Sequence, residues 1–257
     1  MMALLQTSLE SLFRQSDLVQ FGVFCAIGLV FYVISGALML AVSRRADATK
    51  WTPVGPFFGA ISVVFALFLA FHASDIWANK NHAERAYIES GSAIKRLDEL
   101  ASPAQFNLPE VRSALRHYVR YVFRDEWRKN RNHSASDRAD AAFHDLQKYV
   151  TWASRDLPTP IAVQLNALSN DIARTRSDRL WIGANHTEGT SWLAVLLLGL
   201  LTHFAVAAVH FDKPKAGAIA LLILGVTTTL AYWSLGIVDD PYRLAEQLNP
   251  YAWLPGS

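Results

Sequence analysis

Residues 51–74 read WTPVGPFFGAISVVFALFLAFHAS and contain no Asp, Glu, Lys or Arg. As an α-helix this stretch would rise roughly 36 Å, which exceeds the roughly 30 Å of a bilayer's hydrocarbon core. Neither proline nor glycine interrupts residues 75–90. The stretch therefore predicts one long helix that crosses a membrane and continues beyond it without a turn.

Three further uncharged runs are long enough to cross a bilayer: residues 18–43, 189–211 and 216–238. With residues 51–74 they predict four transmembrane helices. Most of the charged residues lie between the second and third helices, at residues 75–188, which predicts an inserted soluble domain. The whole chain has a formal net charge of +2, which is too balanced to favour nucleic acid as a partner.

The inserted domain is predicted to be helical, so the fold class is all-α. Its apolar residues recur at helical spacing, and helix starts are expected at Leu108-Pro109, Ser136 and Thr159-Pro160. Residues 1–17 form an amphipathic segment that is expected to lie on the membrane. In the C-terminal tail, residues 239–257, Tyr251 and Trp253 are expected at the membrane interface.

The second transmembrane helix has two contrasting faces when it is projected at about 100° per residue. The small face is expected to pack closely on another helix, and it consists of Gly55, Gly59, Ser62, Ala66, Ala70 and Ala73. The bulky face meets either lipid or the water of a pore, and it consists of Phe57, Ile61, Val64, Phe65, Phe68, His72 and Asp75. Its polar lower end, His72 and Asp75, makes a pore possible but equally suits the headgroup layer.

No catalytic signature is present: the sequence has no Walker loop, no GxSxG, no HExxH and no cysteine pair. Neither catalytic residues, nor a cofactor, nor a metal site is predicted. Arg174, Arg176 and Arg179 either attract anions at the mouth of a vestibule or form a solvated or headgroup-contacting face. For His203 and the threonines at 227–229, structural hydrogen bonding is favoured over a polar path.

A series of short motifs occurs in a characteristic order. They are Phe71-His72-Ala73-Ser74-Asp75-Ile76-Trp77, Ala83 to Glu89, Tyr118-Val119 with Glu126-Trp127, Arg174 to Leu180, and Asp239-Asp240-Pro241-Tyr242. In these motifs the chain resembles the bestrophin-like family of bacterial membrane proteins, from about Trp51 to Tyr242. Two departures concern the last motif, where Tyr242 replaces the usual Phe and the following glycine is absent.

The resemblance implies a distant relationship to bestrophins, which are pentameric anion channels with a cytoplasmic helical domain and an apolar neck on the second span. It implies Ile61, Phe65 and Phe68 as the neck. His72 and Asp75 are added as pore-lining candidates because they end the same bulky face of the helix. The acidic calcium-binding clasp of animal bestrophins has no clear match here.

We therefore expect an oligomeric channel for small anions in the bacterial inner membrane, with membrane lipid, small ions and further copies of the chain as its partners. The competing hypothesis is a non-conducting structural or sensory membrane protein, or an accessory subunit of a larger complex. Positive charges near the spans are almost equally divided between the two sides. The resemblance alone places the soluble domain and both termini in the cytoplasm.

Overall fold

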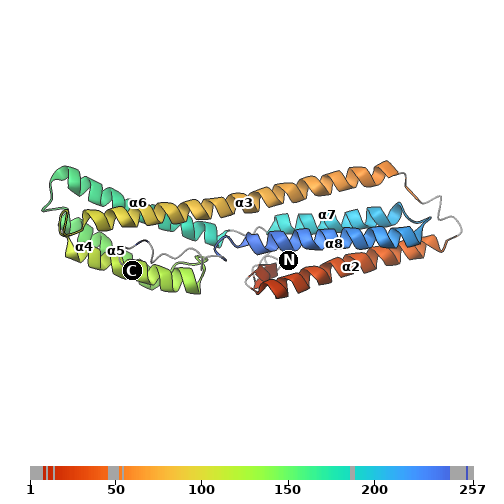
Figure 1. Ribbon diagram of the computed structural model, residues 1–257, viewed down its shortest axis with the longest axis horizontal. Coiled ribbons are helices and arrows are strands. Elements are labelled where there is room, and N and C mark those ends of the chain that lie inside the picture. The colour runs from red at the N-terminus through yellow and green to blue at the C-terminus, as the bar shows by residue number, and fades with distance from the viewer. Residues whose placement is uncertain are drawn as a thin grey trace. The chain divides into compact units, whose positions relative to one another are not determined.

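The structure, a computed structural model, describes residues 8–9, 11–13, 15–45, 52–53, 55–185, 189–243 and 253. Within these ranges the ordered elements are helices and no strand occurs, which confirms the all-α prediction (Figure 1). They are α2 (Asp17–Ser43), α3 (Gly55–Leu100), α4 (Pro109–Tyr121), η2 (Val122–Lys129), α5 (Asp137–Ala153), α6 (Thr159–Ala184), α7 (Gly189–Ala208) and α8 (Pro214–Asp239).

The long helix predicted from residues 51–74 is confirmed. α3 runs without interruption for 46 residues, from Gly55 to Leu100. It starts just after Pro53, and Pro56 fits its first turn, where the amide that proline lacks has no partner inside the helix.

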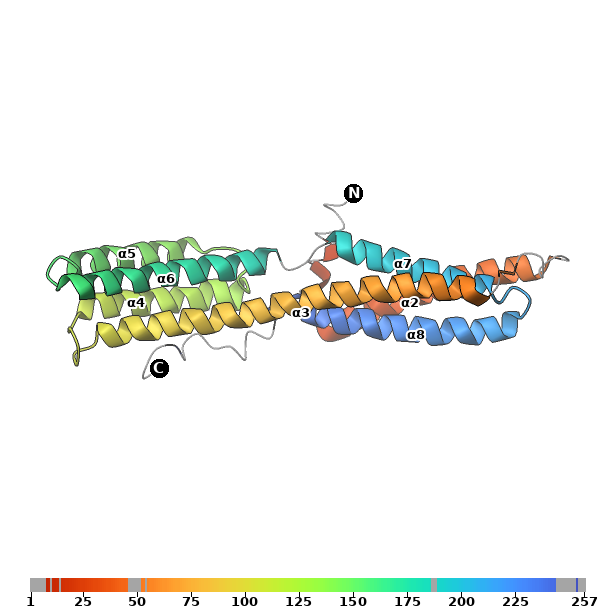
Figure 2. The same ribbon diagram turned by 90° about the horizontal axis from the view of Figure 1, so that it is seen from above.

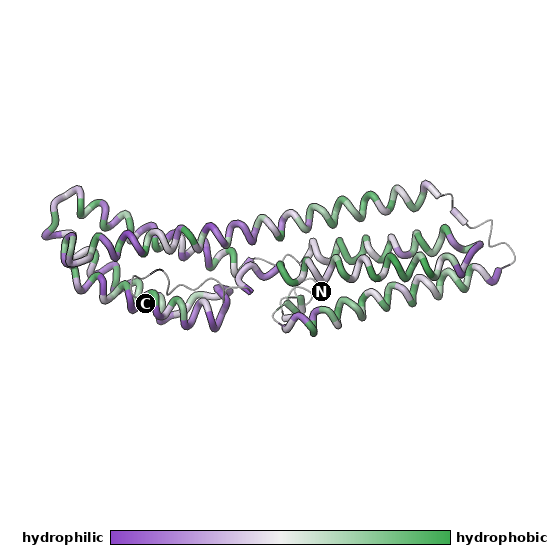
Figure 3. The backbone as a smooth tube through the Cα atoms, in the orientation of Figure 1, coloured by the Kyte–Doolittle hydropathy of each residue, from purple (hydrophilic) through white to green (hydrophobic). Residues whose placement is uncertain are grey.

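The chain forms two compact units, Met1–Trp77 with Thr187–Asp240, and Ala78–His186 with Pro241–Ser257. The first unit contains the four helices that are long and apolar enough to cross a membrane: α2, the first half of α3, α7 and α8. Apolar residues predominate along these helices (Figure 3). In this unit α2, α7 and α8 pack against one another.

The N-terminal segment differs from its predicted position on the membrane surface. Phe13 is buried and its ring packs at a tilt against Trp192, with ring centroids 5.1 Å apart. Leu9 and Leu12 pack against the same cluster, while Leu5 lies outside the described residues. The described part of this segment therefore belongs to the core of the first unit.

The second unit packs α4, η2, α5, α6 and the last part of α3 around one core (Figure 2). Leu97, Leu115, Leu146 and Leu165 each contribute a fully buried side chain from a different helix. The predicted helix starts are confirmed: α4 and α6 carry proline in their first turn, and Ser136 directly precedes α5.

An element that the sequence did not predict follows α4 directly. η2 is a π-helix, in which each turn holds more residues than an α-turn. The side chains of Glu126 and Trp127, which lie in η2, are buried.

Candidate functional site

The inner face of α3 begins with two residues that were predicted to line a pore. Phe65 is buried and its ring meets Tyr232 of α8 edge-on, with centroids 6.4 Å apart. His72 is also buried, and its ring meets Trp192 of α7 edge-on at 4.7 Å. Both side chains therefore lie inside the helix bundle of one chain.

The other three predicted pore residues lie at the edge of this buried face. Ile61 is half-buried, whereas Phe68 is 46% exposed and Asp75 is exposed. The bulky stripe is wider than the surface that the neighbouring helices cover, so one edge is buried and the other is not. Within one chain the five residues do not form a common exposed surface, and a pore-lining role remains a prediction for Ile61, Phe68 and Asp75.

The small face of α3 was predicted to pack on another helix; within one chain Ala73, at its lower end, packs against the core of the first unit, but most of the face is not covered. Gly55, Gly59, Ala66 and Ala70 are exposed, and Ser62 is half-buried. A Cβ atom on Gly55 or Gly59 would meet no described atom within 4 Å. In the most apolar window of α3 only 11% of the residues are buried, against 28% in α2 and 39% in α8.

Trp192 lies at the centre of the first unit and is fully buried. The rings of Phe13, Phe24 and His72 surround its indole at centroid distances of 5.1, 5.8 and 4.7 Å. Its Nε1–H donates a hydrogen bond of 3.1 Å to Oδ1 of Asp239 at the end of α8. Sequence analysis missed Trp192, although a tryptophan in a transmembrane run is a recognisable candidate for such a buried donor.

A buried ion-pair cluster forms the polar centre of the second unit. Glu126 is 0% exposed, and its two carboxylate oxygens accept hydrogen bonds from Arg176 and Arg179. The closest contacts are 2.5 Å from Nη2 of Arg176 and 2.8 Å from Nη2 of Arg179. Asp140 accepts a further hydrogen bond of 2.6 Å from Nη1 of Arg176, so two carboxylates balance two guanidinium groups.

Two further hydrogen bonds from neighbouring groups support the cluster. The Ser136 N–H donates to Oε1 of Glu126 at 3.2 Å, and Nε of Arg179 donates to Oδ1 of Asn132 at 2.8 Å. Asn132 adopts a positive φ of 58°, a conformation that asparagine tolerates better than most residues. Its carbonyl lies so close to Gly183 of α6 that any side chain there would collide with it.

The structure corrects the predicted role of two of the three arginines. Arg176 is 8% exposed and Arg179 is 1% exposed, and their charges are neutralised inside the protein. Arg174 is 59% exposed and makes only long contacts, such as the 3.5 Å contact to Glu89. Attraction of anions therefore remains a prediction for Arg174 alone.

Burial and charge act in opposite directions on the groups of this cluster. Burial lowers the pKa of Arg176, but hydrogen bonds to Glu126 and the charge of Glu126 outweigh it and raise the pKa overall. Burial raises the pKa of the nearby Tyr118 to about 12, although Arg179 and Arg176 act in the opposite direction. Arg179 also lies over the ring of Trp127, with Cζ 5.4 Å from the centroid.

The family of this chain follows from a comparison of its sequence with protein-family models. The sequence model of the bestrophin-like domain matches residues 23–248. The chain belongs to the bestrophin-like family. No curated protein matches the chain.

One solved structure shares this bestrophin-like fold. It is described as the crystal structure of a membrane protein P208A, with 14% sequence identity and a TM-score of 0.60. The similarity covers 90% of this chain and 95% of the other. At this identity the comparison supports the fold alone.

The bestrophin-like motifs gather at two places in the structure. His72 and Asp239 both contact Trp192 in the first unit. In the second unit, Tyr118-Val119, Glu126-Trp127, Arg176 and Arg179 line or adjoin the ion-pair cluster. The ring of Tyr242 meets Trp127 edge-on at 5.5 Å and is fully buried, so tyrosine fills the position where phenylalanine is usual.

Trp253, in the C-terminal tail of this bestrophin-like chain, makes buried aromatic contacts. Trp253 was expected at the membrane interface, but it is 3% exposed and belongs to the core of the second unit. Its ring lies 5.2 Å from Tyr87 and 5.9 Å from Trp127, and it occupies the space that a Cβ atom on Gly91 would need. Tyr251 lies outside the described residues.

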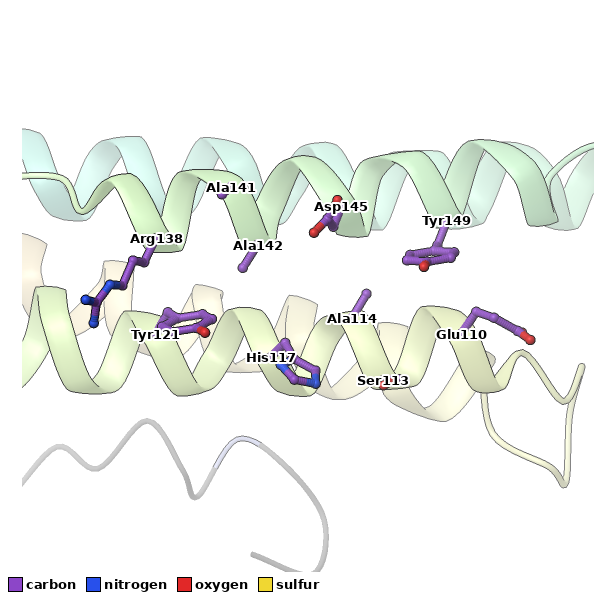
Figure 4. Close-up of a pocket in the computed structure, with 10 residues that line it drawn as sticks. All are labelled: Glu110, Ser113, Ala114, His117, Tyr121, Arg138, Ala141, Ala142, Asp145 and Tyr149. Carbon is purple, nitrogen blue, oxygen red and sulfur yellow. The ribbon is translucent and has the colours of Figure 1, made fainter.

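A groove of about 520 Å³ in the second unit lies between α4 and α5 (Figure 4). Ala114 and Ala142 approach each other across its middle. His117, Arg138 and Asp145 lie along it, and these polar side chains are spread along the two helices rather than converging. Among the described residues no group of three or more His, Cys, Asp or Glu is placed to hold a metal ion.

Proposed function

We propose that this bestrophin-like membrane protein assembles from several copies into an ion channel for small anions. The observation that carries the proposal is the low burial of α3, with 11% of its most apolar window covered by its own chain. Only one face of α3 packs against the other helices of its own chain. Its remaining faces are therefore available to contact neighbouring chains and to line a central path. Family membership supports the same assembly, and anions as the conducted species rest on the resemblance to bestrophins.

The small face of α3 suits the contact between copies. Transmembrane helices associate through van der Waals packing, and small residues allow their backbones to approach. A Cβ atom on Gly59 would meet no atom of the described neighbouring segments within 4 Å, and Ala66 and Ala70 on the same face are exposed. A second copy of the chain is therefore the proposed partner of this face.

The exposed edge of the bulky stripe suits an apolar constriction. Ile61 and Phe68 lie on this edge, one above the other, and Asp75 continues it toward the second unit. A ring of apolar side chains can control conduction because a narrow apolar ring loses its water. Phe65 is reassigned from this ring to the bundle core, where it packs on Tyr232.

Oligomeric state and ion flux test the proposal together. In mild detergent we expect a single oligomer, which Gly59→Leu breaks because leucine blocks the close approach of helices. Gly36→Leu is the matched control, since a Cβ atom on Gly36 of α2 would likewise meet no neighbouring segment within 4 Å in the part of the chain that the structure describes. A monomeric wild-type protein, or equal effects of the two variants, would contradict the proposed interface.

Reconstitution into liposomes tests the path itself. We expect the wild-type protein to conduct anions and Phe68→Ala to raise the flux by widening the constriction. With Cys25 replaced by alanine, a cysteine at position 68 should react with a water-soluble thiol reagent, and a cysteine at the buried position 65 should not. Absence of flux together with absence of labelling at position 68 would favour a non-conducting structural or sensory protein.

Reporter fusions test the proposed location in the bacterial inner membrane. In the proposed topology with four spans, the segment between the second and third helices lies on the same side of the membrane as both termini. A fusion at Ser134 should report the cytoplasm, and fusions at Lys50 and Lys213 should report the opposite side. Reports of Ser134 and Lys50 from the same side would contradict four spans.

A further inference from the structure

Arginines follow one another at every fourth position along the outer face of α4 and η2. Arg112, the first of them, donates two hydrogen bonds of 2.9 Å to the buried carboxylate of Asp98. The remaining four are exposed and form the arginine row: Arg116, Arg120, Arg124 and Arg128. At about 1.5 Å per residue the row is roughly 18 Å long.

The π-helix keeps the arginine row on one face. In an α-helix a step of four residues, at about 100° each, turns roughly 40° too far, so a long row drifts around the helix axis. The bonds of a π-helix join residues five apart, so a step of four residues in η2 falls short of a full turn. Arg124 and Arg128 therefore stay in line with Arg116 and Arg120.

The charges of the arginine row are barely neutralised by the described part of the chain. Arg116 and Arg120 form no ion pair with any described residue. Arg124 is 66% exposed and lies 3.7 Å from Asp125, a long contact. Arg128 lies over the ring of Phe123, with Cζ 5.9 Å from the centroid, which supports the side chain but leaves its charge in place.

The groove of about 520 Å³ between α4 and α5 runs beside the arginine row. Its edge on α4 is formed by Ser113, His117 and Tyr121 (Figure 4). Arg116 and Arg120 directly precede two of these residues, His117 and Tyr121, in the sequence. The row is therefore parallel to this edge of the groove.

The two edges of the groove differ in charge, and its floor is made of small side chains. Ala114 and Ala142 are buried on the facing helices and leave the space above them open. The edge on α5 carries Arg138 and Asp145, whose charges are opposite, and Glu110 lies at one end of the groove. The arginine row thus makes the α4 side the positive side of the groove.

We infer that this surface binds an acidic amphipathic helix of a partner protein. The small or apolar side of that helix lies on Ala114 and Ala142, as in other complexes in which a helix occupies a groove. Its carboxylates, spaced four residues apart, face the arginine row. Successive pairs stay in register because an α-helix rises about 6 Å in four residues on both sides of the contact. Guanidinium groups can bind carboxylates through two parallel hydrogen bonds.

Other anionic partners fit this surface less well. α4 and η2 expose no large hydrophobic side chain, which a helix lying in a lipid surface needs. The net charge of +2 is too small to favour nucleic acid. On α6, the exposed Asp171 and Asp178 already face Arg174, so this helix of a second copy offers no unpaired acidic row.

Peptide binding to the full-length protein in phosphatidylcholine nanodiscs tests this surface without any measurement of ion flux. The probe is a fluorescent helix of about 18 alanine and leucine residues with glutamate at every fourth position, and its glutamine version is the matched control. We expect the glutamate peptide to bind at least about fivefold more tightly, since a single exposed ion pair contributes up to about fivefold. Added salt should reduce this preference.

A third peptide keeps the glutamates but carries central prolines that break the helix, and it should bind more weakly than the intact helix. Equal binding of the glutamate and glutamine peptides would overturn the proposal. Equal binding of the helical and proline peptides, or tighter binding of a single-stranded RNA of the same charge, would also overturn it.

Paired variants assign the binding to the arginine row and the groove. Arg116→Gln with Arg120→Gln should weaken binding of the glutamate peptide by about tenfold. Arg85→Gln with Lys95→Gln, which removes the same charge from exposed positions on α3, should change it little. Ser113→Trp places a bulky side chain in the groove and should weaken binding, whereas Ser113→Ala should not. Equal effects of the two charge pairs, or unchanged binding by Ser113→Trp, would contradict the assignment.

Discussion

Replacement of Glu126 by glutamine tests the buried ion-pair cluster most directly. Glu126→Gln preserves the shape of the side chain but removes the charge that faces Arg176 and Arg179. One carboxylate oxygen becomes an NH₂ group that points at a guanidinium, so a donor meets a donor. Because Glu126 is 0% exposed, water cannot replace the lost acceptor.

The expected cost follows from the burial of both partners. Removal of one member of a buried ion pair costs about 3–5 kcal/mol of unfolding free energy. For a chain of this size each kcal/mol corresponds to a fall of about 2–4 °C in the midpoint of thermal unfolding. We therefore expect the midpoint of Glu126→Gln to fall by at least about 6 °C.

Arg174→Gln is the matched control on α6. Arg174 and its partner Glu89 are 59% and 51% exposed, and their closest contact is 3.5 Å. An exposed pair of this kind contributes about 0–1 kcal/mol, so the midpoint should change little. Tryptophan fluorescence in detergent is a suitable assay, because Trp127 lies against Arg179. Similar midpoints for the two variants would refute the reasoning.

Three further predictions concern single buried contacts. Trp192→Phe removes the hydrogen bond to Asp239 and should lower the unfolding free energy by about 1–3 kcal/mol in denaturant titrations; no loss would show that this bond is dispensable. Burial raises the pKa of Tyr118 to about 12, so between about pH 10 and 12 the folded state keeps this proton while the unfolded state loses it. The unfolding free energy therefore falls as the pH rises through this window. The fall should be about 2–3 kcal/mol larger for the wild type than for Tyr118→Phe. Parallel pH profiles of the two proteins would contradict this assignment. Trp253→Ala should cost about 3–5 kcal/mol in thermal or chemical unfolding, because the ring fills the space beside Gly91; an unchanged midpoint would show that the tail adds no stability.

Local sequence patterns determined the elements of this fold. The uncharged run at 51–74 and the unbroken residues after it were sufficient to predict the continuous helix α3. The starts of α4 and α6 followed from proline, which lacks the amide that a first turn does not use. The order of short motifs was sufficient to identify the bestrophin-like family, which the match over residues 23–248 confirms.

Only the tertiary structure decided which side chains of each helix are covered. Helical periodicity places Phe65 and Phe68 on one stripe of α3, but it does not show which part of that stripe the neighbouring helices cover. The same limit applies to Arg174 and Arg179, which are close in sequence but differ completely in exposure. The charge of Arg179 is neutralised by Glu126, which lies 53 residues away in the sequence. Glu126 belongs to the π-helix η2, and the spacing of apolar residues did not predict this π-helix. Burial depends on contacts between segments that are distant in the sequence. The pattern along one helix therefore determines which residues share a face, but not which segment covers that face.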